Sequence, residues 1–147
     1  EIFLSVLAEQ MPGLEPLIRG LAERAGEGSV RGNLEELADT AIAFYTETFP
    51  VAMSVYSTQS LLVAHRDRVH ELGGGPHLPL DALAGYLDAE RALGRIGADA
   101  DPQAMASLLV GACFHHAFLA TFAGDPLPDE ERARLAARLV AALLGPV

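Results

Sequence analysis

The segment VGACFHHAFLATFAG, residues 110–124, is apolar apart from two adjacent histidines and one threonine. Neighbouring residues on a helix point about 100° apart, so a helix over this segment cannot turn both imidazoles toward one partner. On a helical wheel one stripe holds Met105, Leu108, Ala112 and Leu119, and the remaining side holds Val110, Phe114, Ala117 and Thr121. Because a helix that is apolar on all sides is normally buried on all sides, we expect this helix to be covered on more than one face.

A second copy of the chain is the partner that we expect to cover the second face. The chain has 147 residues, which is the size of one domain, and we assign that domain to residues 1–147. The last helix follows after a short loop and carries its own Leu and Val stripe, so two such antiparallel hairpins would form a four-helix bundle. The residues predicted at this homodimer interface are Leu109, His116, Leu135, Leu139, Val140 and Leu143.

Composition narrows the fold class and the partners. Half of the residues are hydrophobic and only 6% are aromatic, with Ala and Leu dominant, which favours helices over strands. The net charge of -10 argues against binding of nucleic acid or an anionic membrane by this chain itself, because phosphate binding needs a surplus of positive groups. A single cysteine, Cys113, fits a reducing compartment. No uninterrupted apolar run reaches the roughly 18 residues typical of a membrane span, so we expect a cytoplasmic protein.

Helical periodicity and helix-ending residues predict an all-α bundle of about six or seven helices. Asn33 and Glu36 resemble a capping box, Phe49-Pro50 is expected to break a helix, and Gly97 is expected to cap one. Asp101-Pro102 is typical of a helix start. The predicted helices cover residues 1–10, 14–21, 33–48, 50–72 with a kink near 57–60, 80–96, 101–124 and 128 onward.

The candidate acid, base and metal-binding groups have simpler structural interpretations. Adjacent histidines diverge on a helix, and His65 and His70 are five residues apart, so no HxxxH spacing is present. No serine or cysteine lies in a pattern typical of a nucleophile. Glu90 follows Tyr86 by one helical turn, and we expect it to pair with an arginine such as Arg91 or Arg95. We therefore predict no catalytic residues, no metal site and no cofactor.

The order of features along the chain resembles the C-terminal regulatory domain of the tetracycline-repressor (TetR) family of bacterial transcription regulators. The resemblance is carried by EIFLSVL at residues 1–7, by LDALAGYLDAERALGRIGADADPQAMASLLVGACFHHAFLATFAGDPLPDEE at 80–131, and by LAARLVAALL at 135–144. The shared pattern is a Leu-rich helix ending in Gly-Arg, an Asp-Pro cap, a Leu-Leu-x-Gly-Ala helix and a final dimerising helix. In this family an N-terminal helix-turn-helix reads operator DNA, and we expect such a domain to precede Glu1, with EIFLSVL as the start of the connecting helix.

The resemblance also implies a function for the described pattern. The two last helices would be the homodimer interface, and a cavity among the three middle helices and the inner side of the histidine helix would hold a small, largely apolar effector. Effector binding would favour a conformation in which the two helix-turn-helix domains of the dimer no longer have the spacing of successive major grooves. The repressor would then leave its operator. Helical face and aromatic character select the ligand-binding candidates, which are Phe44, Tyr45, Met53, Tyr56, Gln59, Tyr86, Glu90, His115 and Phe118.

Two other classes of function remain open from the sequence. A ligand-free helical dimerisation or interaction module would use the same faces, with the aromatic residues serving as core packing only. A small helical enzyme would use Glu90 or His115 as an acid or base.

Overall fold

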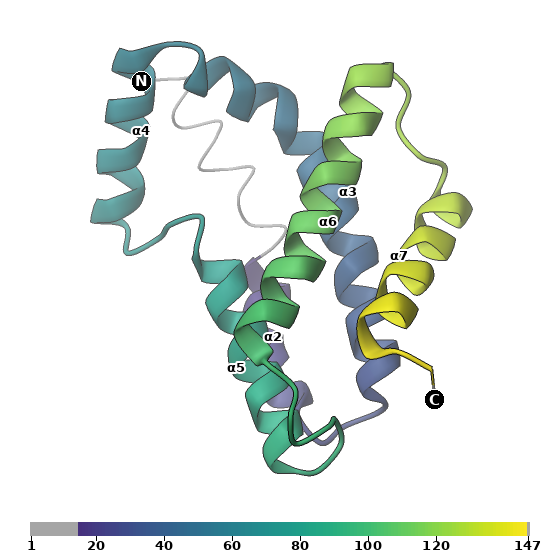
Figure 1. Cartoon of the computed structure of the whole chain (residues 1–147). Coiled ribbons are helices and arrows are strands. Elements are labelled where there is room, and N and C mark those ends of the chain that lie inside the picture. Colours follow the sequence, from purple (N-terminus) through teal and green to yellow (C-terminus); the bar gives the residue numbers. More distant parts are fainter. Residues whose placement is uncertain (1–14, 147) are drawn as a thin grey trace.

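The computed structural model describes residues 15–146, and over that range every regular element is a helix (Figure 1). The all-α prediction is therefore confirmed. Six α-helices and one short 3-10 helix follow one another: α2 (Glu15–Leu21), η2 (Ala22–Arg24), α3 (Val30–Tyr56), α4 (Gln59–Glu71), α5 (Leu78–Ala92), α6 (Pro102–Ala123) and α7 (Asp129–Leu144). The helix predicted over residues 1–10, and with it EIFLSVL, lies outside the described residues.

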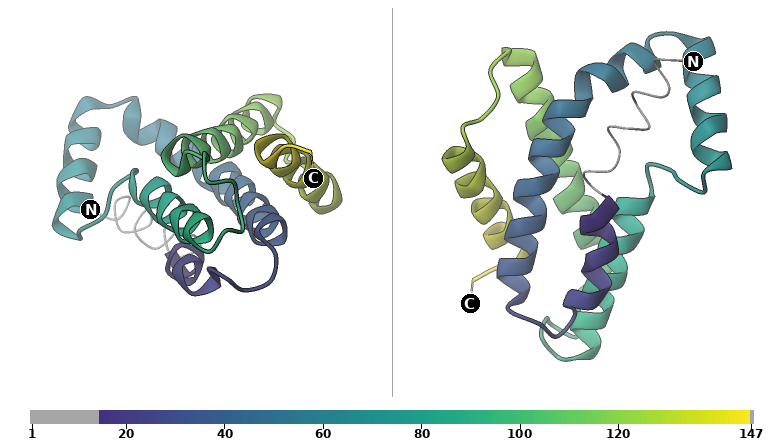
Figure 2. Two further views of the ribbon diagram at one scale, coloured as in Figure 1. Left: turned by 60° about the horizontal axis from the view of Figure 1, so that its bottom comes forward. Right: turned by 180° about the vertical axis from the view of Figure 1, so that it is seen from behind.

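The long helices α3 and α6 form the centre of the bundle. They pack against each other over the longest interface in the fold, with α5 and α2 on one side and α7 on the other (Figure 2, left). The last helix, α7, runs back from the end of α6, as the predicted antiparallel hairpin requires (Figure 1). It packs more extensively against α3 than against α6.

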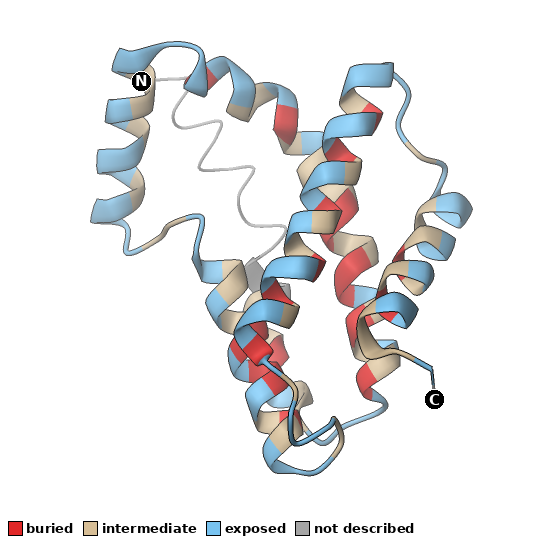
Figure 3. Cartoon of the chain, viewed as in Figure 1, coloured by how far each residue is buried: buried red, intermediate tan, exposed pale blue. Residues whose placement is uncertain are grey.

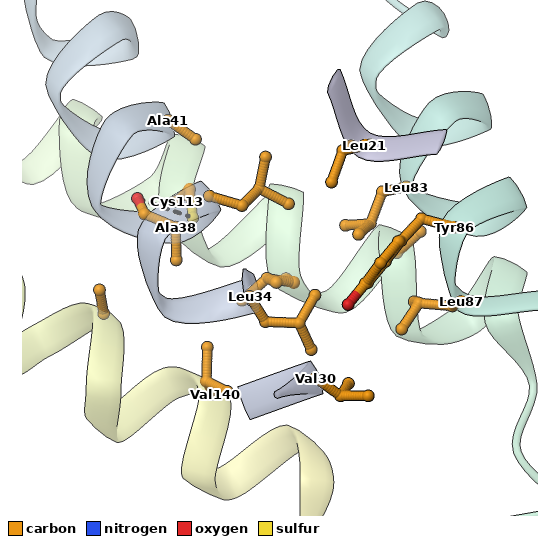
Figure 4. Close-up of a cluster of buried hydrophobic side chains, with 14 of the residues drawn as sticks. Leu21, Val30, Leu34, Ala38, Ala41, Leu83, Tyr86, Leu87, Cys113 and Val140 are labelled. Atoms are coloured by element: carbon orange, nitrogen blue, oxygen red, sulfur yellow. Dashed lines mark hydrogen bonds between the residues drawn. The ribbon is translucent and has the colours of Figure 1, made fainter. Parts of the chain in front are cut away.

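The core is built from small and aliphatic side chains of five helices (Figure 4). Leu34 of α3, Leu83 and Leu87 of α5, and Val140 of α7 are each 0% exposed. Ala38 of α3 lies against α6, where the Cys113 thiol approaches its carbonyl oxygen at 3.7 Å. Small residues at this crossing let the two central helices approach closely, and this close approach positions α6.

The start of α3 differs from the predicted capping box. Ser29, not Asn33, is the N-cap, because its hydroxyl oxygen accepts a hydrogen bond from the backbone N–H of Gly32 at 3.0 Å. Asn33 lies inside the helix, where its side-chain amide donates to the carbonyl oxygen of Glu27 at 3.0 Å and to the hydroxyl of Tyr86 at 2.9 Å. Both residues are good capping types, and the long-range partner on α5 decides which of them caps the helix.

The predicted break at Phe49-Pro50 is also wrong. Helix α3 continues through Pro50 to Tyr56 and ends at Ser57. A proline within a helix removes one backbone hydrogen bond and bends the helix, but burial of flanking side chains such as Phe49 and Val55 offsets that loss. The kink predicted near residues 57–60 is instead the junction between α3 and α4.

The other helix ends follow their sequence signals with one exception. Asp101 caps α6 by accepting from the N–H of Ala104 at 3.1 Å, and Gly124 ends α6 with a φ of 71°. The end of α5 is set by Gly94, which has a φ of 75°, and not by Gly97. Gly94 comes directly after the last turn of α5, where a left-handed residue lets the chain reverse and brings Arg95 back toward the helix.

Candidate functional site: the outer face of α6 and the aromatic cluster

Helix α6 is covered on one side only. Its buried positions are Pro102, Ala106, Leu109, Cys113, Ala117 and Ala120, which face α3 and α5. The opposite side carries large apolar residues that remain exposed, and Figure 3 shows exposed residues running along the length of this helix. We call Leu108, His115, Leu119 and Phe122 the outer face of α6, where Leu108 is 66% and Phe122 84% exposed. The expectation that α6 is buried on more than one side is therefore not met within a single chain.

The structure places the predicted dimer residues in three different environments. Leu109 and Val140 are 2% and 0% exposed within one chain, so they belong to its own core and cannot meet a partner. Leu135, Leu139 and Leu143 are half-buried along α7, and His116 is half-buried on α6. Leu109 is predicted at the interface but lies outside the stripe of Met105, Leu108, Ala112 and Leu119 on the wheel, and in the structure it packs into the chain's own core. The exposed residues Leu108, Leu119 and Phe122 were not among the predicted interface residues.

An aromatic cluster joins the second half of α3 to α6. Tyr45 contacts Phe114 with ring centroids 5.4 Å apart, Phe49 contacts Phe114 at 5.3 Å and Phe118 at 5.7 Å, and Phe44 contacts Tyr45 at 5.5 Å. These distances and the mostly edge-on ring geometry are those of favourable aromatic pairs. Phe114 and Phe118 remain 44% and 42% exposed, so the cluster has a buried side and an open edge.

Of the nine predicted ligand-binding residues, three lie in this cluster and a fourth stacks on it. Phe44, Tyr45 and Phe118 are members, and the ring of His115 stacks on Phe118 with centroids 6.4 Å apart. Met53, Tyr56 and Gln59 are exposed where α3 ends and α4 begins. Tyr86 and Glu90 are buried residues of α5. The structure therefore does not gather the nine residues around one cavity.

Burial raises the pKa of two side chains at the buried side of the cluster. It raises the pKa of the Tyr45 phenol to about 12, with a smaller contribution from Cys113. Burial also raises the pKa of the Cys113 thiol to about 12. Since a reactive cysteine needs a low thiol pKa, Cys113 is a packing residue and is unsuited to nucleophilic chemistry.

Only a very small enclosed space lies next to the cluster. It has a volume of about 10 Å³ between α2, α3, α5 and α6, and Tyr45, Leu109 and Cys113 are among its lining residues. That is room for about one water molecule. Tyr45 is the single predicted ligand-binding residue that lines it.

Glu90 is the one charged residue that is buried among the residues described, and its role is structural (0% exposed). One carboxylate oxygen accepts from the backbone N–H of Gly26 at 2.8 Å, and the other lies 2.6 Å from Nε of Arg95. Arg95 also donates to the carbonyl oxygens of Gly26, Glu27 and Gly28 at 2.8, 3.0 and 3.0 Å. The expected pairing of Glu90 with an arginine is confirmed, with Arg95 as the partner.

This set of contacts, which we call the Glu90 brace, fixes the loop between η2 and α3 onto the end of α5. Tyr86 extends it, since its hydroxyl accepts from Asn33 near the start of α3. Burial is the main cause that raises the pKa of Tyr86, and the nearby Glu90 carboxylate adds to it. A buried charge is tolerated when it is paired and hydrogen-bonded. Arg95 supplies the opposite charge and the Gly26 N–H supplies a hydrogen bond to Oε1, whereas Oε2 lies beside Arg95 without a hydrogen bond from any described residue.

His115 and His116 diverge as the sequence predicts. Their ring centroids are 5.8 Å apart, with His115 on the exposed side and His116 half-buried. Burial lowers the pKa of His116, and the neighbouring His115 and Arg138 of α7 lower it further. His116 is therefore held neutral between α6 and α7. Over residues 15–146, no three His, Cys, Asp or Glu side chains lie close enough to hold a metal ion.

Helix α6 is also long and apolar enough, by length and composition, to span a membrane. A single helix of this kind is weak evidence for a membrane span, because the mostly buried core helix of a soluble protein passes the same test, and 28% of the apolar window of α6 is buried within the bundle. Comparison with family models, with curated proteins and with solved structures finds no match to this chain.

We predict that Glu90→Ala lowers the free energy of unfolding by about 3 kcal/mol or more, because Arg95 and the Gly26 N–H lose their buried acceptor. The matched control is Asp67→Ala, an exposed carboxylate on α4, which should change stability by less than about 0.5 kcal/mol. Urea unfolding of the two variants beside the parent chain is the measurement. Equal stability of both variants would mean that the brace does not hold the loop.

Proposed function

We propose that this chain is the regulatory domain of a bacterial transcription regulator similar to the TetR family. In this proposal it dimerises through α6 and α7, senses a small and largely apolar effector, and acts in the cytoplasm. Contact with operator DNA is made by an N-terminal domain outside this chain, and effector binding releases the repressor from DNA. The observation that carries the proposal is the exposed apolar outer face of α6.

The outer face has the spacing of a helix-pairing surface. Leu108, His115 and Phe122 recur every seven residues, with Gly111 and Leu119 filling the intermediate positions. A seven-residue repeat of apolar positions is typical of helices that pair along a seam, and here Leu108 and Phe122 are the apolar positions while His115 between them is polar. A glycine at the middle of that seam has no side chain to keep a second helix away, and a Cβ added at Gly111 would meet no atom within 4 Å. Contiguous exposed apolar surface of this kind marks an interaction site.

A second copy of the chain fits this surface better than an unrelated partner. Helix α7 packs mainly against α3 and much less against α6, and it carries the half-buried Leu139 and Leu143. Two α6–α7 hairpins related by a two-fold axis would bury these apolar residues together in a four-helix bundle. His115, near the middle of the seam, would then lie close to the axis.

The open edge of the aromatic cluster supports the effector half of the proposal. Phe114 and Phe118 are about two-fifths exposed and are backed by Tyr45 and Phe49, so an apolar ligand would bury surface against a preformed wall. Met53, Tyr56, Gln59 and the remaining predicted ligand residues stay predictions. The enzyme alternative is weaker, because the Glu90 carboxylate is already bound to Gly26 and Arg95 and is closed off from solvent.

The dimer is tested with Leu108→Glu and Leu119→Glu, which place a carboxylate on the outer face. Leu72→Glu on the exposed end of α4 is the matched control, since Leu72 is 61% exposed. Burying an unpaired carboxylate costs about 3 kcal/mol or more, so each outer-face variant should dimerise at least about 100-fold more weakly. Sedimentation equilibrium gives the dimer dissociation constant, and circular dichroism should show unchanged helix content. Dimerisation of these variants at the parent's strength would contradict the proposal.

Effector sensing is tested by thermal unfolding of the chain against a library of small apolar compounds. At least one compound should raise the melting temperature, because a ligand that binds only the folded state stabilises it. Phe118→Ser should abolish the shift, whereas Leu93→Ser, at another exposed apolar site (58% exposed), should leave it intact. If no compound stabilises the chain, the ligand-free interaction module becomes the better account.

A further inference from the structure

A second hollow lies at the far end of the bundle from the Glu90 brace. It has a volume of about 430 Å³ and is lined by residues of the second half of α3, the end of α6 and the connection to α7. Figure 1 shows how these segments are arranged. Binding sites for small organic molecules fall in the range of about 300–1,000 Å³. The nine predicted ligand-binding residues do not include any of its lining residues, so this hollow is separate from the aromatic cluster.

The walls of the hollow are mostly apolar. Ile42 and Pro50 of α3, Ala120 of α6 and Leu127 of the connection to α7 are among the lining residues. Ile42 and Ala120 are buried, so the floor is fixed by the packing of α3 on α6. A ligand with an apolar body would therefore find a preformed surface there.

Two hydrogen-bond acceptors at the hollow lack an ordinary partner. The hydroxyl oxygen of Thr121 is buried and has no hydrogen-bond partner among the described residues. The carbonyl oxygen of Thr46 would bond to the backbone N–H four residues later in a regular helix, but that residue is Pro50, which has no N–H. Thr46, Pro50 and Thr121 all line the hollow. An unsatisfied buried polar group costs free energy, so a ligand that donates hydrogen bonds here is favoured.

The charges around the hollow are negative. Glu47 and Asp125 line it and are exposed, and neither carboxylate is in an ion pair with any described residue. The single cation in the lining, Arg132, is already held by Asp39 at 2.8 Å and by Asp129 at 3.0 Å. The carbonyl end of the α6 dipole adds negative potential at the same place. An anionic ligand would therefore be repelled, and a cationic ligand attracted.

We propose that this hollow binds a small organic cation, an amine carried on an apolar body. The ammonium group lies between the carboxylates of Glu47 and Asp125, while the apolar body packs on Ile42 and Pro50. The Thr121 hydroxyl, which is closed off from solvent in the structure, accepts from the ammonium once its side chain rotates toward the hollow. The proposal goes beyond the regulator function and does not depend on it, because it uses neither the outer face of α6 nor the open edge of the aromatic cluster.

The test measures binding of hexylamine, hexanol and hexanoate to the chain by isothermal titration calorimetry at neutral pH. The three probes share an apolar body and differ in charge. Hexylamine should bind more tightly than hexanol, hexanoate should bind most weakly, and added salt should weaken only the amine, because salt screens charge interactions.

The variants identify the site. Glu47→Gln and Asp125→Asn should each weaken hexylamine binding about two- to fivefold, the range for partly exposed ion pairs, and leave hexanol unchanged. Thr121→Val keeps the shape of the side chain, removes the acceptor and should weaken the amine as well. Asp99→Asn, which removes one exposed carboxylate at the opposite end of α6, is the matched control and should have no effect.

Three outcomes would overturn the inference: hexanoate binding as tightly as hexylamine, absence of saturable amine binding, or amine binding that is insensitive to Glu47→Gln and Asp125→Asn. Amine binding that is lost in Phe118→Ser instead would move the ligand to the aromatic cluster. None of these outcomes bears on dimerisation through α6, so failure here and failure of the regulator proposal are distinguishable.

Discussion

The close packing of α6 on α3 is the contact on which the rest of the structure depends. Small residues at the crossing, Ala38 on α3 and Cys113 and Ala117 on α6, let the helix backbones approach and exclude water from the centre of the bundle. This contact uses only one side of α6, so it determines which residues of α6 remain outside. The packing of α6 on α3 also forms the aromatic cluster. It supplies the floor of the hollow that Thr121 lines as well.

The cost of leaving the outer face of α6 in water is the physical argument for a dimer. Leu108, Leu119 and Phe122 are each more than two-fifths exposed in the single chain. Burial of such side chains is worth about 1.5–3 kcal/mol each when it is complete, so covering them twice in a symmetric pair is a large favourable contribution. Against that stand the loss of rotational and translational freedom and the burial of the polar His115 imidazole.

In the Glu90 brace a buried charged residue holds two segments of the fold together. The loop before α3 contains two glycines, Gly26 and Gly28. Glu90 and Arg95, at the end of α5, hold this loop through hydrogen bonds to the backbone of the two glycines. The brace ties the start of α3 to α5 at one end of the bundle. At the other end, α4 contributes no buried residue and projects away from the core. The described chain is therefore tightly joined at one end and open at the other.

The sequence predicts the structure correctly where residues close in sequence determine it. The predictions are wrong where contacts between distant residues determine the structure. The cap at Asp101, the end of α6 at Gly124 and the Glu90–Arg95 pair all follow from residues close in sequence. The preference for Ser29 over Asn33 as a cap depends on Tyr86, which is 53 residues away from Asn33. The passage of α3 through Pro50 likewise depends on tertiary burial, which local propensity does not contain.

The candidate site shows the same limit. A helical wheel identifies that α6 is apolar all round, but only packing reveals that Leu109 faces inward and Leu108 outward. The hollow beside Thr121 combines two segments that are distant in sequence, residues 42–50 and 120–132, so no single stretch of residues indicates it. Tyr86 and Glu90 are predicted as ligand-binding residues, and the structure shows a protein partner for each: Asn33 near the start of α3 for Tyr86, and Gly26 in the loop before α3 for Glu90.

Hydroxyl-radical footprinting across protein concentrations tests most directly whether a second copy of the chain covers the outer face of α6. If it does, modification of Leu119 and Phe122 falls as the concentration rises, while modification of the exposed Leu72 stays constant. Modification of Leu119 and Phe122 at the same rate as a free surface residue at every concentration would mean that no second copy covers this face.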